Sequence, residues 1–451
     1  MNRSLAHFAR IAGGRLNGDD RAWSAVVTDT RKLQAGELYL ALRGPRFDGN
    51  EFVAAAVASG AAGAVVDRKV SAPGLPLIEV EDGQQALTLA SAAWRRDFNG
   101  TVVAVAGSNG KTTTKELTAA ILSQRGAVLA TRGNLNNHIG VPLTLLRLAD
   151  EPFAVIEIGA NGPGEVAALV ELAAPQVALI TNAGAEHLEG FGDLDGVARA
   201  EGELVANLPP SSVAVLNADD PYFGLWRGMT SARVASFGTS ASADYRASDV
   251  HEELGDEGFA LRFTLTTPQG PAEVKLGLGG LHNVVNAAGA AAAAISAGAT
   301  LADVVAGLAS VRPVPGRLQP RRTRHGARLI DDSYNANPSS MRAGIDVLVG
   351  LGGTPWLVIG DMGELGTHAE TSHTDIGRYA RERGVAKLFA TGPLSTRAVE
   401  AFGAGARWFP DTESLSRALD AELAPEVTTL IKGSRSARLE RVVGALLAEV
   451  H

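Results

Sequence analysis

A short glycine-containing loop, Gly107-Ser108-Asn109-Gly110-Lys111-Thr112-Thr113, constrains the fold of this chain more than any other stretch. It follows the apolar, β-branched run Val102–Ala106 and precedes a segment of helix-forming residues that begins near Thr112. A strand, a glycine turn and a helix in this order place backbone N–H groups and the positive end of the helix around an anion. We therefore predict a nucleotide phosphate site at this loop.

The residue types in the loop agree with that prediction. Gly107 and Gly110 allow the backbone to turn without a Cβ atom in the way. Lys111 is able to reach the outer phosphates, and the Thr112 hydroxyl is able to hold Mg²⁺. Val105 stands where the longer form of the motif has its first glycine, so this is the shorter Gly-x-x-Gly-Lys-Thr form. The alternative is a structural glycine turn with a surface lysine, and we favour the phosphate site.

Length, charge and cysteine usage limit the class of protein. A chain of 451 residues predicts about three domains, and its net charge of −8 argues against nucleic-acid binding. The chain contains no cysteine, which excludes disulfides, thiolate catalysis and cysteine-ligated metals. The alanine-rich run Ala287–Ala299 is too weakly apolar for a membrane span, and the N-terminus lacks a signal-peptide core. We expect a monomer in the cytoplasm, without membrane insertion.

Hydrophobic patterning divides the chain into three α/β domains. Residues 1–84 contain short strands and one helix and form a small N-terminal domain. Residues 85–311 alternate buried-strand runs with helical stretches, which predicts a doubly wound, mostly parallel sheet. Within them, the short alternating runs of residues 244–278 predict an antiparallel insert. A proline-marked joint at residues 312–317 opens a second such domain, predicted to be Rossmann-like, over residues 312–451.

Polar side chains follow several of the predicted strands. In an open α/β sheet, ligands bind beyond the carboxyl ends of the strands. A carboxylate at such a place is able to ligate Mg²⁺ directly or through water. Any one of these residues has an ordinary structural explanation, but their occurrence on one edge with a phosphate loop favours a site. They are Asn134, Asn136, Asn137, Glu157, Asn182 and His187.

Two polar loops of the first domain also carry arginines. They are Thr28–Arg31 and Arg43–Asn50, and their composition suits a bound phosphate or sugar. Exposed loops contain arginine and aspartate anyway, so composition leaves both interpretations open.

Taken together, these residues resemble the Mur ligase family over the whole chain. The phosphate loop matches the family's loop. The stretch Asp331–Met341 is similar to the subfamily that adds D-alanyl-D-alanine, and relatives that add glutamate or diaminopimelate carry other residues there. Gly360–Gly366 and Lys432–Arg435 agree with the same subfamily.

The resemblance implies an ATP-dependent amide ligase with ATP and Mg²⁺ as cofactors. In the family, ATP phosphorylates the terminal carboxylate of the growing peptide, which would be UDP-N-acetylmuramoyl-tripeptide here. The amine of the incoming D-alanyl-D-alanine attacks the acyl phosphate, and a tetrahedral intermediate then releases phosphate. The third residue of the tripeptide is left open between diaminopimelate and lysine.

The resemblance also assigns roles to residues of this chain. Lys111 and the loop amides would hold the phosphates, with Thr112 and Glu157 on one Mg²⁺ and His187 on a second. The other assignments are Asn283 and Asn286 for adenine; Arg317 and Asp332 for phosphates and ribose; Thr28, Asp29, Thr30, Arg31, Arg43, Gly44, Asp48, Gly49 and Asn50 for the uridine diphosphate end; Asn134, Asn136 and Asn137 for the sugar-peptide; and Tyr334, Asn335 and Asn337 for the dipeptide.

Two positions depart from the family pattern. Most relatives have a lysine, carbamylated by CO₂, that helps to hold the second Mg²⁺, and Glu201 occupies that position here. We hypothesise that Glu201 supplies the same negative charge, although its carboxylate lies three bonds closer to the backbone; the alternative is that it only caps a surface helix. Asn50 occupies a position where relatives often have histidine, so we expect the contacts to the nucleotide end of the substrate to differ in detail.

Two other classes of function remain as alternatives. One is another ligase of the superfamily, such as a folylpolyglutamate-type enzyme, against which the stretch Asp331–Met341 argues. The other is a non-catalytic scaffold in which ATP only changes the domain positions. The joint presence of the phosphate loop, Glu157 and His187 favours catalysis.

Overall fold

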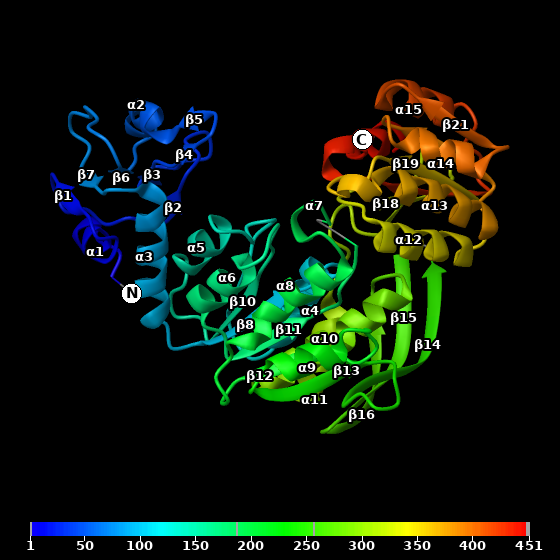
Figure 1. Cartoon of the computed structure of the whole chain (residues 1–451), viewed down its shortest axis with the longest axis horizontal. Helices are drawn as coiled ribbons and strands as arrows, with labels where there is room; N and C mark the ends of the chain where they lie inside the picture. Colours follow the sequence, from blue (N-terminus) through cyan, green and yellow to red (C-terminus); the bar gives the residue numbers. More distant parts are fainter. Residues whose placement is uncertain (1, 186–187, 256–257, 448–451) are drawn as a thin grey trace.

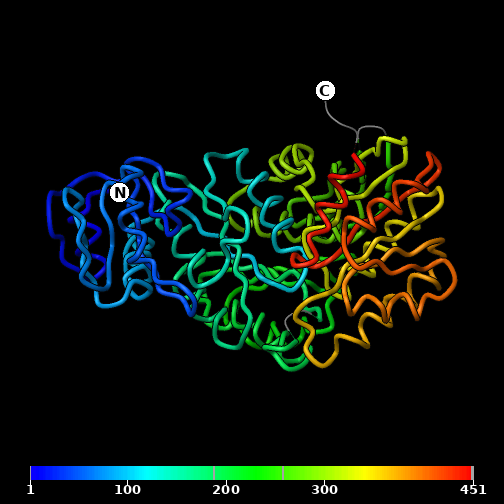
Figure 2. Tube along the Cα trace, turned by 90° about the horizontal axis from the view of Figure 1, so that it is seen from above, coloured from blue at the N-terminus to red at the C-terminus, as the bar shows by residue number. Residues whose placement is uncertain are grey.

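The computed structural model describes residues 2–185, 188–255 and 258–447. Three sheets form three domains in a row from the N-terminus to the C-terminus, as the colour sequence of Figure 2 shows. The first and third domains rise from the two ends of the central domain, so the molecule is curved (Figure 1). The predicted three-domain α/β fold is confirmed. Among the described residues, no helix combines the length and apolar character needed to cross a membrane.

The N-terminal domain has a five-stranded sheet of order β1-β7-β6-β3-β2, in which only β1 is antiparallel to its neighbour. A two-stranded hairpin, β4-β5, projects from it. The elements are α1 (Leu5–Ile11), β1 (Arg15–Asn17), β2 (Val26–Val27), β3 (Leu38–Leu40), β4 (Arg43–Gly44), β5 (Phe47–Asp48), η1 (Gly49–Phe52), α2 (Val53–Ala58), β6 (Gly63–Val66) and β7 (Leu77–Glu79).

The central domain has a nine-stranded sheet of order β16-β15-β14-β13-β12-β11-β8-β10-β9. The predicted antiparallel strands β14, β15 and β16 extend the main sheet, because β14 pairs in parallel with the end of β13. The strands are β8 (Thr101–Ala106), β9 (Val128–Ala130), β10 (Phe153–Glu157), β11 (Val177–Ile180), β12 (Val213–Asn217), β13 (Arg233–Gly238), β14 (Tyr245–Gly255), β15 (Gly258–Thr267) and β16 (Gly270–Leu276).

Helices cover both faces of this sheet, because the buried strands direct apolar side chains alternately to one face and to the other. Val103 and Val105 of β8 point to a core with α4, α10 and α11, whereas Val102 and Ala104 point to a core with α3, α5, α6 and α8. The helices are α3 (Gly83–Arg96), α4 (Lys111–Leu122), α5 (Gly140–Leu145), α6 (Glu165–Ala173), α7 (Leu188–Phe191), α8 (Leu194–Ala206), α9 (Phe223–Met229), α10 (Leu281–Ser296) and α11 (Leu301–Ser310).

The C-terminal domain has a six-stranded sheet of order β17-β18-β22-β19-β20-β21, parallel except for the edge strand β17. Two hydrophobic clusters lie on its two faces. The elements are β17 (Gln319–Arg322), β18 (Arg328–Asp332), α12 (Pro338–Gly350), β19 (Thr354–Gly360), η2 (Gly366–His368), α13 (Ala369–Glu382), β20 (Lys387–Thr391), α14 (Ser395–Phe402), β21 (Ala406–Phe409), α15 (Thr412–Asp420), β22 (Val427–Lys432), η3 (Arg435–Ala437) and α16 (Glu440–Leu446).

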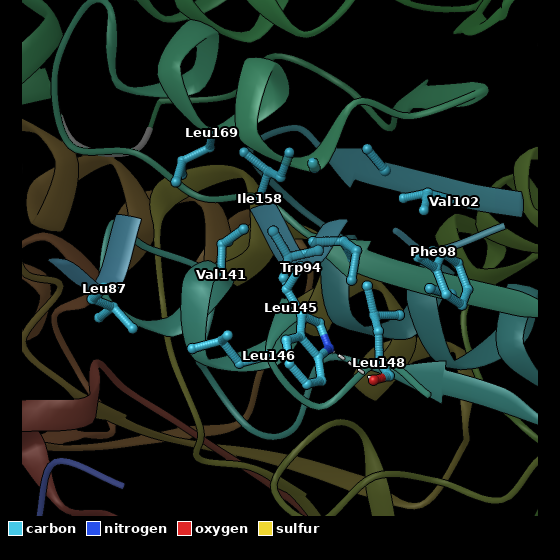
Figure 3. Packing of buried hydrophobic residues seen from close by; sticks show 14 of the residues in the cluster. Leu87, Trp94, Phe98, Val102, Val141, Leu145, Leu146, Leu148, Ile158 and Leu169 are labelled. Carbon is cyan, nitrogen blue, oxygen red and sulfur yellow. Dashed lines mark hydrogen bonds between the residues drawn. The ribbon is translucent and has the colours of Figure 1, made fainter. Parts of the chain in front are cut away.

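Helix α3 joins the first two domains through Trp94. This side chain is buried, its indole N–H donates to the Leu148 carbonyl at 2.9 Å, and its ring lies 5.3 Å from that of Trp23. Figure 3 shows Trp94 in one cluster with Leu145 and Phe98. The predicted domain boundary at residues 84 and 85 thus falls inside the first turn of α3, because the helix begins at Gly83.

We expect Trp94→Ala to lower the free energy of unfolding by about 3–5 kcal/mol, because a large cavity would open between the two domains. Trp94→Phe is the matched variant, since it keeps an aromatic ring but leaves the Leu148 carbonyl unpaired, at a cost of about 1–3 kcal/mol. Denaturant titration followed by far-UV circular dichroism measures both. A loss below about 1 kcal/mol in Trp94→Ala would contradict the role of this contact.

Candidate functional site

The phosphate loop lies at the carboxyl end of β8, between the ends of β10 and β11. The backbone of Gly107 has φ of 120°, and a Cβ atom there would lie only 2.1 Å from the Thr181 hydroxyl. Gly110 has φ of 81° and is the N-cap residue of α4. Both positions therefore require glycine for backbone conformation and for space, since a Cβ atom on Gly110 would lie 2.5 Å from the Asn286 side-chain oxygen.

The backbone N–H groups of the loop divide into two sets. Those of Gly107, Ser108 and Asn109 donate to the Glu201 carboxylate (2.7 Å), the Asn182 carbonyl (2.9 Å) and the Asn182 side-chain oxygen (3.0 Å). The N–H groups of residues 110–113 belong to the first turn of α4 and have no partner within the helix. An anion would therefore bind at residues 110–113, where the helix dipole is also most favourable.

The ammonium group of Lys111 lies over the loop. It donates to the carbonyls of Gly107 at 2.5 Å and Ser108 at 3.1 Å. A phosphate oxygen would be a stronger partner for this cation than a backbone carbonyl, because hydrogen bonds between charged groups are stronger. The position of Lys111 thus suits a lysine that turns toward bound phosphate.

Glu157, at the end of β10, has the properties expected of a magnesium ligand. It is only 2% exposed, and Asn136 donates to its Oε1 at 2.9 Å, whereas its buried Oε2 has no hydrogen-bond partner. The nearest cation is the buried ammonium of Lys115, 3.9 Å from Oε2, which donates to the Thr131 carbonyl. A buried carboxylate oxygen without a partner is costly, and coordination of a cation would satisfy it.

The described residues contain no cluster of three or more histidine, aspartate or glutamate side chains that could hold a metal alone. Mg²⁺ in nucleotide sites is typically held by one or two carboxylates together with substrate phosphates. Glu157 and the Thr112 hydroxyl fit that arrangement. His187, predicted for a second Mg²⁺, lies outside the described residues.

The C-terminal domain contributes Arg317 to the same place. Its guanidinium donates to the Thr112 hydroxyl at 3.0 Å and lies over the Tyr334 ring at 4.5 Å. Asp332 accepts from the Leu318 N–H at 3.2 Å and from the Lys432 ammonium at 2.7 Å. One oxygen of Asp332 therefore holds the segment that carries Arg317, and the other holds Lys432 of β22; its contact with phosphate or ribose stays a prediction.

The two asparagines of α10 lie beside the loop. Asn286 donates to the Asn283 side-chain oxygen at 3.0 Å, and Asn283 donates to the Gly279 carbonyl at 2.7 Å. A Cβ atom on Gly110 would lie 2.5 Å from the Asn286 side-chain oxygen. Asn286 thus packs directly against the turn of the phosphate loop.

The remaining predicted residues are in different surroundings. Asn137 caps α5 by accepting from the N–H groups of Ile139 and Gly140, and the Asn134 carbonyl accepts from the N–H of Asn136. Tyr334 lies near both Arg317 and Arg435, the Asn335 carbonyl accepts from Lys432, and Asn337 donates to Asn109. Three of these residues belong to the phosphate-loop group. Asn136 contacts Glu157, Tyr334 contacts Arg317, and Asn337 contacts Asn109 of the loop itself.

The predicted residues of the first domain form a separate group. Arg31 holds Asp29 through two hydrogen bonds of 2.8 Å, which lower the pKa of that carboxyl to about 2. Asn50 is buried, and its amide donates to Asp48 and Asp67 at 2.7 Å each. Arg43 pairs with Asp67, the Gly49 carbonyl accepts from Tyr39, and Gly44 lies in the hairpin that carries Arg43; Thr28 and Thr30 belong to the Asp29 loop.

Sequence reasoning missed Lys115, Thr131 and Ser339 as parts of this site. Lys115 lies one helical turn after Lys111, and this spacing places both lysines on the same face of α4. Nothing in the sequence indicates that Lys115 is buried. Ser339 lies inside the subfamily stretch and receives a hydrogen bond from the loop residue Asn109.

Comparison with known proteins gives one family over most of the chain. Residues 23–124 match the Mur ligase family catalytic domain, residues 105–294 the Mur ligase middle domain, and residues 316–435 the Mur ligase glutamate ligase domain.

Three proteins illustrate the similarity. UDP-N-acetylmuramoyl-tripeptide–D-alanyl-D-alanine ligase of Escherichia coli is 44% identical over 448 residues, or 98% of each chain. A crystal structure of MurF from Acinetobacter baumannii superimposes with a TM-score of 0.90 at 34% identity, covering 98% of both chains. MurF ligase from Thermotoga maritima in complex with ADP has a TM-score of 0.81 at 26% identity, covering 93% of this chain and 96% of that one.

We expect Gly110→Ala to weaken ATP binding by roughly tenfold or more, because a side chain there is strained by about 1–2 kcal/mol and collides with Asn286. Gly164→Ala is the matched control. Gly164 is also a helix N-cap residue, with φ of 83°, but a Cβ atom there meets nothing within 4 Å. Titration of each variant with MgATP measures the difference, and equal affinities would contradict the site.

Proposed function

Because the chain belongs to the Mur ligase family, we propose that it joins D-alanyl-D-alanine to UDP-N-acetylmuramoyl-tripeptide in an ATP-dependent reaction. One structural observation carries the catalytic part of this proposal. The first N–H groups of α4, the carboxylate oxygen of Glu157 that has no hydrogen-bond partner, and the guanidinium of Arg317 lie around one phosphate loop. Similarity to UDP-N-acetylmuramoyl-tripeptide–D-alanyl-D-alanine ligases over almost the whole chain supports the choice of substrates.

In the proposed reaction, a carboxylate oxygen of the tripeptide takes the γ-phosphoryl group of ATP, and ADP is the leaving group. The amine of D-alanyl-D-alanine then attacks the acyl carbon, loses a proton and forms the amide bond as phosphate leaves. N–H groups 110–113 and Lys111 bind the phosphates, and Arg317 approaches from the opposite domain. Glu157 and Thr112 would hold Mg²⁺, which offsets the repulsion between the carboxylate and the triphosphate.

The arrangement of the domains supports the idea that the site shields the acyl phosphate from water. The loop belongs to the central domain, whereas Arg317 and Asn337 come from the C-terminal domain. A site completed by two domains closes over its substrates, which limits hydrolysis of the reactive intermediate. The first-domain loops at Asp29 and Asn50 would hold the uridine diphosphate end, far from the reacting carboxylate.

We place this reaction in cytoplasmic synthesis of the peptidoglycan precursor, on which cell shape and cell division depend. The absence of cysteine from the chain is compatible with a reducing compartment.

Glu201 takes the place of the family's carbamylated lysine in this proposal. Its Oε2 accepts from the Gly107 N–H at 2.7 Å, so its carboxylate is at the phosphate loop rather than on a surface helix end. We infer that this carboxylate both holds the first glycine of the loop and supplies negative charge near the second Mg²⁺.

We expect phosphate release from MgATP to require both UDP-N-acetylmuramoyl-tripeptide and D-alanyl-D-alanine. Leaving out one component at a time, with mass spectrometry of the product, tests the proposal. Release with glutamate in place of the dipeptide would favour a folylpolyglutamate-type ligase. ATP binding without turnover under all combinations would favour a nucleotide-binding scaffold.

We expect Glu201→Gln to lower kcat about tenfold to a hundredfold and to raise the Mg²⁺ concentration needed, because a charged acceptor is lost. Glutamine keeps an oxygen for the Gly107 N–H, so comparison with Glu201→Ala separates the charge from the hydrogen bond. The wild-type rate should not depend on added bicarbonate. A normal rate and Mg²⁺ requirement in Glu201→Gln would show that the charge has no such role.

A further inference from the structure

Three side chains form a closed ring of hydrogen bonds between the central and C-terminal domains. Asn337 donates through Nδ2 to Asn109 Oδ1 at 2.8 Å, and Asn109 donates through Nδ2 to the Ser339 hydroxyl at 2.9 Å. Ser339 donates to Asn337 Oδ1 at 3.1 Å and closes the ring. Asn109 is the third residue of the phosphate loop, whereas Asn337 and Ser339 belong to the N-terminus of α12.

One backbone N–H group, that of Ser340, determines which atom donates and which accepts in every bond of the ring. The N–H of Ser340 donates to Asn337 Oδ1 at 2.8 Å, which fixes the orientation of that amide. Asn337 Nδ2 must then face Asn109, which presents its oxygen to Asn337 and its nitrogen to Ser339. Donors and acceptors match at each of the three contacts, so the ring is fully satisfied.

The backbone of Asn109 is held independently by the central sheet. Its N–H donates to Asn182, and its carbonyl accepts from the hydroxyl of Thr181 at 2.6 Å and the amide of Asn182 at 3.0 Å. The side chain is therefore the part of Asn109 that connects the loop with the other domain. The ring occupies none of the N–H groups 110–113 and leaves Thr112 untouched, so it is compatible with bound phosphate.

We propose that Asn337 and Ser339 are positioning residues that dock the C-terminal domain onto the phosphate loop through Asn109 and thereby raise the affinity for ATP. A nucleotide held by both the loop and Arg317 needs the two domains together. A contact that keeps α12 on the loop lowers the free-energy cost of bringing the two domains together when ATP binds. The site is then preorganised for the nucleotide. This inference rests on the proposed function, because it assigns ATP to the loop.

Gly184 shows how closely the ring is packed. Its backbone φ is outside the left-handed region, but a Cβ atom there would lie 2.8 Å from Asn109 Nδ2 and 3.1 Å from the Ser339 hydroxyl. Gly184→Ala would therefore push the ring apart without removing any of its polar groups. This variant disturbs the ring independently of Ser339→Ala.

The experiment is titration of the full chain with MgATP, together with kcat and KM for ATP. We expect Ser339→Ala to raise the dissociation constant about two- to tenfold, the effect of one hydrogen bond, with a smaller change in kcat. Ser339→Thr should restore most of the affinity, and Gly184→Ala should reproduce the loss. In an Asn109→Ala background, Ser339→Ala should have no further effect, because the two residues act through each other.

Ser340→Ala is the matched control. The Ser340 hydroxyl accepts from the Asn337 N–H as part of the α12 capping box, but it is not in the ring. We expect this variant to weaken the helix end without changing ATP affinity. An equal loss in Ser340→Ala and Ser339→Ala would overturn the proposal in favour of helix stability.

The other outcomes separate the two proposals. Normal ATP affinity in both Ser339→Ala and Gly184→Ala would overturn the ring's role and leave the ligase assignment standing. Additive effects of Asn109→Ala and Ser339→Ala would also overturn it. Failure of the wild-type chain to bind MgATP would overturn the proposed function and the ring's role with it.

Discussion

The N–H groups at the start of α4, which have no partner within the helix, are the constraint on which the rest of this structure depends. A glycine turn after a central strand leaves these donors at the edge of the sheet, aligned with the helix dipole. Everything assigned to catalysis is arranged around them: Glu157 from the next strand, Glu201 from α8 and Arg317 from the C-terminal domain. The positive helix end favours a negative group such as phosphate at this place, and the other groups lie around it.

The loop is also the point at which two domains are coupled. Its first three N–H groups donate to other parts of the protein and so hold its shape, whereas the next four have no partner within the helix that they begin. From the other side, Arg317 and the ring at Asn109 bring the C-terminal domain to the same loop. Binding of nucleotide and docking of the domain therefore act on a single segment of seven residues, Gly107–Thr113.

Much of this arrangement was predictable from local sequence. The phosphate loop, the three α/β domains and Glu157 at a strand end were all predicted, because each depends on residues close together in the chain. The roles of Asp332 and Asn50 were not predictable in detail. Asp332 orders the Arg317 segment and Asn50 bridges two aspartates, and both contacts depend on partners that the fold brings from elsewhere.

The sequence by itself determined the family, the loop and the alternation of strands and helices, since glycine positions and hydrophobic periodicity express local backbone preferences. Only the tertiary structure decided which loop amides the protein itself binds, that the second oxygen of Glu157 has no hydrogen-bond partner, and that Asn337 contacts Asn109. These facts depend on groups separated by up to 228 residues, whose meeting is set by domain packing. Hydrogen bonding between such groups depends on their final positions, which no local pattern encodes.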